Sequence, residues 1–381
     1  MTTHHPIAVV GAGLGGLTLA RVLHLHGTEA AVFDLDASPT ARHQGGMLDL
    51  HTDSGQAALR AAGLHDAFLA AVRPGGEAVR IVDRDGTFRL RDDTQTGERP
   101  EVNRHDLRRI LLDSLPAGTI RWGARVTAAH PLGDGRHRVT LADGTTFTTD
   151  LLVGADGAWS RIRPLLSAAV PAYCGISFVE SDLRDAAARH PATAELTGHG
   201  MMFALADGKG FLTHLEGDGT VHSYAALRVP ANWADGTDFT DTRAAAAFVL
   251  ERFEGWDERL RALLADADGT LVARPIHALP VGHRWERRPG VTLLGDAAHL
   301  MSPFAGEGAN LAMLDGAELA TALAAHPGDT EAALTAYERA MFPRSERSAA
   351  ESADGLDLCF GPDAAHRLAE LMTGHRPQPA G

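Results

Sequence analysis

The chain has 381 residues, with 35 basic and 49 acidic side chains and a formal net charge of −14. This length is enough for one large or two ordinary domains. Because the sequence contains no basic run, it offers no evident surface for binding nucleic acid. No apolar run reaches the length of a membrane span, and the first residues lead into a predicted strand instead of a signal peptide, so we expect a cytoplasmic protein. Cys174 and Cys359 have no metal or redox spacing and the 20 histidines form no ligand cluster, so we expect no metal site.

The first predicted elements are a strand, a glycine-rich turn and a helix. An apolar run comes directly before Gly11, Gly13 and Gly16, which have the spacing G-x-G-x-x-G. In a dinucleotide-binding unit the first glycine makes the turn, the second lets the backbone approach the pyrophosphate, and the third lets the helix pack on the strand. A second apolar strand ends at Asp34, where an acid is expected to bind a ribose 2′-hydroxyl. The alternative is a glycine-rich turn in an unrelated α/β protein.

The middle of the chain alternates short strands with helices. The pattern predicts, in order, a loop over residues 36–46, a helix over 56–63, a hairpin over 79–90, a helix opening at 103–109 and a hairpin over 138–147. A further apolar strand ends in Asp156-Gly157. From residue 172 to 273 the pattern changes to antiparallel strands, with a turn at Asp218-Gly219, followed by one helix over 242–265. Because no linker separates this region, we expect a second domain inserted into the first.

The strongest single motif lies late in the chain. A buried strand over residues 291–294 ends at Gly295-Asp296, and a loop leads from there into an Ala/Leu-rich helix; the loop and the start of the helix contain Pro303, Gly306, Gly308 and Asn310. An acid at the carboxyl end of such a strand lies where open α/β sheets bind ligands, and the following helix offers unpaired backbone N–H groups. The motif therefore predicts a nucleotide cofactor site. Two more helices, over 331–357 and 363–372, follow.

These motifs together resemble the single-component FAD-dependent aromatic hydroxylases over nearly the whole chain. The local patterns at residues 45–51, 55–56, 103–104 and 295–301 resemble most closely those of the flavin monooxygenases that inactivate tetracyclines. The resemblance implies an α/β fold: a Rossmann-like FAD-binding domain with an inserted antiparallel-sheet substrate domain and a long C-terminal helix. The expected boundaries are 1–75, 101–171 and 274–330 for the FAD-binding domain, 76–100 and 172–273 for the substrate-binding domain, and 331–381 for a C-terminal helical segment.

The same resemblance implies the cofactor contacts. It assigns FAD to the three glycines of the first motif, Asp49, Arg104 and Asp296. The motifs described above add Asp34 and the loop residues Pro303, Gly306, Gly308 and Asn310 as cofactor-binding candidates. NADPH is expected to visit transiently and to contact Arg42, and Asp156 is expected to serve both cofactors. Three of these assignments have a structural alternative: Asp49 as a helix cap, Arg104 in a surface ion pair, and Arg42 solvated in its loop.

The implied reaction is a hydroxylation. Reduced flavin reacts with O₂ to give a C4a-hydroperoxide, which oxygenates an electron-rich carbon of a polycyclic, phenolic or enolic small molecule. A tetracycline-like molecule or another polyketide is compatible, in antibiotic resistance or in biosynthesis, and we expect a monomer. Glu180 and His222 are the candidates for orienting the substrate, and Met201 and Phe211 for its apolar walls.

Four departures from the family pattern bear on this expectation. Leu35 stands where an arginine usually follows the acid of the second strand, and Glu307 replaces the usual glutamine, which places an acid near the flavin. Glu180 replaces a substrate-binding glutamine, and Met201 falls where the tetracycline-degrading enzymes carry an arginine. Tetracycline itself is therefore in doubt. An FAD oxidase or dehydrogenase, and a flavoprotein that sequesters a ligand without oxidising it, remain as alternatives.

Overall fold

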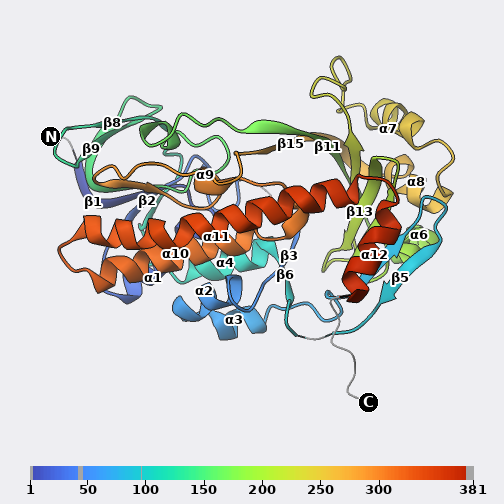
Figure 1. The fold of residues 1–381 in the computed structure, drawn as a ribbon, viewed down its shortest axis with the longest axis horizontal. Helices are drawn as coiled ribbons and strands as arrows, with labels where there is room; N and C mark the ends of the chain where they lie inside the picture. Colours follow the sequence, from blue (N-terminus) through green and yellow to red (C-terminus); the bar gives the residue numbers. More distant parts are fainter. Residues whose placement is uncertain (1–2, 42–45, 96, 375–381) are drawn as a thin grey trace. The chain divides into compact units, whose positions relative to one another are not determined.

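The computed structural model describes residues 3–41, 46–95 and 97–374. The chain folds into two compact units, each assembled from segments that are separate in the sequence. Unit 1 comprises Met1–Val72, Arg104–Ala172 and His277–Ala353, and unit 2 comprises Arg73–Asn103, Tyr173–Ile276 and Asp354–Gly381. Figure 1 labels the helices and strands of both units. The boundary between the last segments of the two units lies between Ala353 and Asp354.

Unit 1 is built on a sheet of parallel strands with an antiparallel edge. Its strands are β1 (Thr3–Val10), β2 (Ala31–Phe33), β7 (Ile120–Arg121), β8 (Val126–Pro131), β9 (His137–Leu141), β10 (Thr146–Gly154) and β16 (Val291–Leu293). The parallel strands are in register at their ends, since Val10 pairs with Phe33 and with Gly154, and Gly154 pairs with Leu293. The residues that follow these strands therefore emerge at one edge of the sheet, where open α/β sheets bind ligands.

Helices bring further chain ends to this edge. Unit 1 contains α1 (Leu14–Leu25), α2 (Gly55–Ala61), α3 (His65–Leu69), α4 (Arg104–Asp113), α9 (Asp296–His299), α10 (Gly308–Ala325) and most of α11 (Thr330–Cys359), with the short β3 (Met47–Asp49) and the 3-10 turns Arg163–Leu165 and Pro303–Ala305. α1 and α10 pack against each other (Figure 1), and Gly15 at the start of α1 lies against Ala312 near the start of α10. The amino-terminal ends of both helices consequently lie close together.

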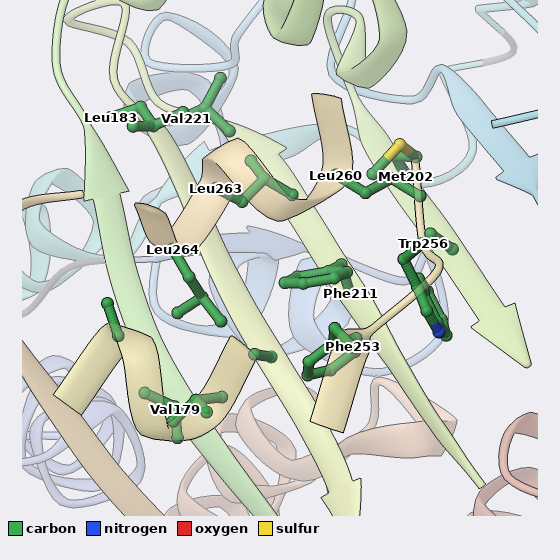
Figure 2. Close-up of a cluster of buried hydrophobic side chains, with 14 of the residues drawn as sticks. Val179, Leu183, Met202, Phe211, Val221, Phe253, Trp256, Leu260, Leu263 and Leu264 are labelled. Atoms are coloured by element: carbon green, nitrogen blue, oxygen red, sulfur yellow. The ribbon is translucent and has the colours of Figure 1, made fainter. Parts of the chain in front are cut away.

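Unit 2 is built on a sheet against which several helices pack. In spatial order the strands are β15 (Asp268–Ala278), β11 (Ala172–Leu183), β14 (Val221–Arg228), β13 (Lys209–Leu215), β12 (Met201–Ala206), β4 (Val79–Val82) and β5 (Phe88–Asp92). The other elements are β6 (Glu101–Asn103), α5 (Ala186–Arg189), α6 (Pro191–Thr197), α7 (Thr242–Leu250), α8 (Glu258–Ala265) and α12 (Ala364–Gly374). Figure 2 shows the core: Phe253, Trp256 and Leu263 of the helical segment cover Phe211 and Val179 of the sheet. Burial of these apolar side chains stabilises the helix-on-sheet packing.

The expected fold class is confirmed, as are the three hairpins and the long helix α11. One element was wrong. Residues 242–265 form the two helices α7 and α8, because the connection between them contains Gly255 with φ +76°. Asp257 caps the second helix, since its side chain accepts from the Arg259 backbone N–H at 2.8 Å. Within the described residues, none of the helices combines the length and the apolar character needed to cross a membrane.

Candidate functional site

The three glycines of the motif that follows β1 differ in their surroundings. Gly11 has φ +111°, and a side chain there would collide with the Ala155 carbonyl oxygen; a side chain at Gly16 would collide with the Gly11 carbonyl oxygen. At Gly13, by contrast, a Cβ would meet no atom within 4 Å. Gly13 therefore leaves open space at the start of α1, whose first turn holds no acid, as an anionic group at a helix N-terminus requires.

Asp34 at the end of β2 is used by the protein itself. Its carboxylate accepts from the backbone N–H of Ala12 at 2.6 Å and of Asp36 at 2.8 Å, and the residue is only 7% exposed. These bonds fix the shape of the glycine-rich loop. The expected contact with a ribose hydroxyl stays a prediction.

Asp156 and Arg163 organise the end of β10. Asp156 Oδ2 accepts from the Arg161 backbone N–H at 2.6 Å, while its buried Oδ1 has no hydrogen-bond partner among the described residues, and burial raises the pKa of this carboxyl. Arg163 donates to the carbonyl oxygens of Ala297 at 2.8 Å and of Asp296 at 3.1 Å. Arg163 thus ties the β10 and β16 ends together. Sequence reasoning missed it, although it follows Asp156 closely in the chain.

Asp296 presents its carboxylate to solvent from a crowded position. The residue is exposed, yet the protein around it removes enough hydration to raise the pKa of Asp296, an effect that His299, Arg104 and Arg163 oppose. None of the described residues is recorded as donating a hydrogen bond to this carboxylate. An exposed acid surrounded by protein is the arrangement expected where a ligand donates the hydrogen bonds.

A buried charge network lies beneath Asp296, and nothing in the sequence pointed to it. Asp315 of α10 is fully buried, and its Oδ2 accepts from the Gly295 backbone N–H at 3.0 Å and from His299 Nε2 at 2.6 Å. Its Oδ1 accepts from Arg344 at 2.9 Å. Although burial opposes both shifts, the pair holds the pKa of Asp315 below and the pKa of His299 above their usual ranges. The network fixes the Gly295-Asp296 turn.

The start of α10 is joined to the segment after β3 by Asn310. This buried amide accepts from the backbone N–H groups of His51 and Gly55 and donates to the carbonyl oxygens of Asp49 and Gly306, at 2.9 to 3.2 Å. All of its hydrogen-bonding positions are therefore used within the protein, and Asn310 shapes the loop rather than offering an unsatisfied group. Pro303 opens the 3-10 turn that precedes Gly306 and Gly308.

Glu307, the acid expected near the flavin, has a histidine partner that the sequence did not indicate. Glu307 Oε1 lies 2.8 Å from Nδ1 of His51, and the Nε2 of that ring lies 3.0 Å from Oδ2 of Asp49. Burial lowers the pKa of His51, but the bonds to Asp49 and Glu307 outweigh it and raise the pKa to about 9. The imidazole is thus cationic at neutral pH and balances one of the two acids.

Arg104 and Arg42 are the two basic residues expected to contact the cofactors. Arg104 begins α4, its backbone N–H donates to the Gly46 carbonyl oxygen at 3.0 Å, and its charge acts on Asp296. Arg42 lies outside the described residues.

The register of the unit 2 sheet places the expected substrate residues. Asp182, His222, His214 and Met201 occupy directly paired positions, and Glu180 lies two residues from Asp182, on the same face. His222 Nδ1 lies 2.6 Å from Asp182, His214 Nε2 lies 3.1 Å from Glu216, and Glu180 pairs with Arg274. Sequence reasoning overlooked His214.

The expectation that Phe211 forms an apolar wall of the substrate site is wrong. Phe211 pairs with Ala225 and Ala204 on the opposite face of the sheet, fully buried against Phe253 and Trp256, so it belongs to the hydrophobic core (Figure 2). It cannot line a site on the Glu180 face.

The unit 1 edge thus fits a dinucleotide. It offers open space at Gly13 and the N-termini of two helices, where an anionic group can bind. The acids Asp156, Asp296 and Glu307 have oxygens without a partner among the described residues or open to solvent, which can accept from ribityl hydroxyl or N–H donors.

A family model described as an FAD binding domain matches residues 4–352. The chain belongs to this family. Monooxygenase asqM of Emericella nidulans is 32% identical over 434 residues, spanning 96% of this chain and 98% of its own. The 3-amino-4-hydroxybenzoate 2-monooxygenase PtnB3 of Streptomyces platensis is 32% identical over 402 residues, spanning 99% and 95%.

The fold is also that of solved flavoenzymes. The crystal structure of the tetracycline destructase Tet(55) matches with a TM-score of 0.75 at 20% identity, over 97% of this chain and 94% of that one. The chain is therefore an FAD-dependent monooxygenase, and the expected family and FAD cofactor are confirmed. At 20% identity, the likeness to Tet(55) is one of fold.

Proposed function

We propose that this monooxygenase uses NADPH and O₂ to insert one oxygen atom into a polycyclic, phenolic or enolic small molecule. The balance is one substrate, O₂, NADPH and a proton giving hydroxylated product, water and NADP⁺. Bound FAD would supply the hydride acceptor and the oxygen activation. The FAD would be held by the Gly13 loop, Asp296 and the α10 N-terminus.

The observation that supports this substrate class is the polar face of the unit 2 sheet. Its residues Glu180, His222 and His214 each meet a charged partner, and the half-buried Met201 and Phe203 lie on the same face. A flat molecule with hydroxyl groups along one rim suits such a mixture, because its rings cover apolar side chains while its hydroxyls meet imidazole and carboxylate. The name of PtnB3 states an aromatic hydroxy acid as that enzyme's substrate.

The experiment is turnover with isotopically heavy O₂ and NADPH, followed by mass spectrometry of the product. The ligand is first chosen by screening polycyclic phenols and tetracyclines for accelerated NADPH oxidation. One heavy oxygen in the product supports the proposal, and label found only in peroxide and water indicates an oxidase. Tight binding without NADPH oxidation would indicate a sequestering flavoprotein.

A variant pair tests the assigned face. His222→Gln should lower kcat/KM about tenfold, the loss expected for one hydrogen bond of roughly 1.5 kcal/mol. His366→Gln removes an exposed histidine of α12 that pairs with Glu370 and serves as the control. Equal kcat/KM in both variants would contradict a substrate role for His222. We also propose that the enzyme is a monomer, which light scattering on the purified protein would test.

A further inference from the structure

The segment after β3 and the start of α10 meet through three titratable side chains. The His51 side chain is 7% exposed and lies between Asp49 Oδ2 at 3.0 Å and Glu307 Oε1 at 2.8 Å. A neutral imidazole has a single N–H, so it can donate to only one of two flanking carboxylates. With both acids ionised, both contacts are hydrogen bonds only when the ring carries two protons. The geometry therefore requires an imidazolium.

The charge of the imidazolium is compensated by Asp49 and Glu307. Three polar side chains near this cluster have partners of their own: Asn310 of α10 bonds to the backbone, and Gln56 of α2 donates to the Leu50 carbonyl oxygen and also meets His65 of α3. Ser54 also lies nearby, since its backbone N–H donates to the His51 carbonyl oxygen. The pKa of His51, which burial would lower, rises to about 9 through Asp49 and Glu307 alone. With both acids ionised, the three groups together carry one negative charge while His51 is protonated and two once it has lost that proton.

One carboxylate oxygen of Glu307 is not used in the contact with His51. Its Oε2 is buried and has no hydrogen-bond partner among the described residues. Buried carboxylate oxygens are normally paired, so an unpaired one marks an acceptor position for a bound group. Glu307 also stands between Gly306 and Gly308 at the N-cap of α10, in the loop that belongs to the FAD site.

We propose that Glu307 is an FAD-binding residue whose free oxygen accepts a hydrogen bond from the cofactor, and that His51 positions Glu307 and neutralises one acid through a proton shared with Asp49. This inference rests on FAD binding and not on the proposed substrate. An oxidised flavin offers an imide N–H and ribityl hydroxyls as donors. A protonated His51 keeps Glu307 in place without a second uncompensated charge beside the cofactor.

The first measurement needs no cofactor. The imidazole of His51 is followed by NMR titration of the apoprotein and assigned by its loss in His51→Gln. We expect a midpoint near 9 and a clear fall of this midpoint in Glu307→Gln, because one of the two raising groups has lost its charge. Titration near the ordinary value of about 6.5 would overturn the shared proton.

The second measurement is FAD affinity of the apoprotein from flavin fluorescence between pH 7 and 10.5. The wild-type dissociation constant should rise about tenfold as pH passes 9, since a raised histidine pKa means that the favourable charge is lost above it. Glu307→Ala should weaken binding about tenfold at pH 7 and remove this pH step. Asp134→Asn removes an acid from an exposed ion pair with Arg136, and it should keep the step. Wild-type affinity in Glu307→Ala would overturn the cofactor contact, whatever substrate the enzyme takes.

Discussion

Replacing Asp315 with alanine tests whether the buried charges beneath the Gly295-Asp296 turn hold the cofactor end of β16. Asp315 is fully buried and accepts from Gly295, His299 and Arg344. Removing one partner of a buried ion pair costs roughly 3–5 kcal/mol, because the other charge stays in the interior without compensation. Arg344 keeps a second partner on α10, Glu318, when Asp315 is replaced. The larger loss is therefore the ion pair of His299. We expect the low end, about 3 kcal/mol of unfolding free energy.

The pH dependence of this loss follows from the two pKa shifts. The folded-state pKa of Asp315 is lowered, so its contribution is present above its unfolded value of about 4 and is lost as pH falls through the folded value. The folded-state pKa of His299 is raised, so its contribution is present below about 6.5 and is lost as pH rises through the folded value. The difference between wild type and Asp315→Ala should be largest between about pH 4 and 6.5.

Urea unfolding followed by circular dichroism at several pH values provides the measurement. Asp134→Ala is the matched control, since it removes an aspartate from an exposed ion pair with Arg136 and should leave the unfolding midpoint unchanged. Asp315→Asn separates charge from shape, because it keeps an acceptor for the Gly295 N–H but loses the ion pairs. If Asp315→Ala and Asp134→Ala unfold at the same midpoint at pH 5.5, the network does not support the turn.

The remaining predictions concern the cofactors. Asp296→Ala should purify with much less FAD, because losing a hydrogen bond to a charged group costs roughly 1.5–3 kcal/mol, or tenfold to hundredfold in affinity; full FAD content after dialysis would refute it. Gly13→Ala should fold normally but bind FAD more weakly, whereas Gly16→Ala should lower the unfolding temperature, since its methyl group meets the Gly11 carbonyl oxygen; equal behaviour of the two would contradict the assigned roles. Arg42→Ala should weaken apparent NADPH affinity with FAD retained and Arg42→Lys should restore it partly, in stopped-flow flavin reduction.

The cofactor half of the fold could be predicted from sequence because its rules are local. A strand, a G-x-G-x-x-G turn and a helix lie within about twenty consecutive residues, and Gly295-Asp296 likewise follows its strand directly. Each motif fixes its own backbone, and parallel strands then bring the ends together. The hairpins at Asp85-Gly86 and Asp143-Gly144 were found for the same reason, since the turn type depends on two adjacent residues.

Errors arose where the answer depends on residues far away in the chain. The face on which Phe211 lies is decided by α7 and α8, which cover one side of the sheet, and alternation alone does not say which side is buried. The ion pair of Glu307 with His51 could not be predicted, because the two residues lie 256 positions apart in the chain. Asp315 falls within an ordinary helical pattern, and only the fold places it beneath Gly295.

The acids at the unit 1 edge show why a motif identifies a site more readily than it assigns its contacts. Asp34 and Asp315 spend both carboxylate oxygens on bonds within the protein and so hold backbone in place. Asp156 and Glu307 each keep one buried oxygen without a partner among the described residues, and Asp296 is exposed. An unpaired buried oxygen is costly unless a ligand supplies the donor. We therefore expect FAD binding to stabilise the protein mainly through Asp156, Glu307 and Asp296. Replacing Asp34 or Asp315 should instead lower the stability of the apoprotein. Thermal unfolding of the variants with and without FAD can distinguish these two effects.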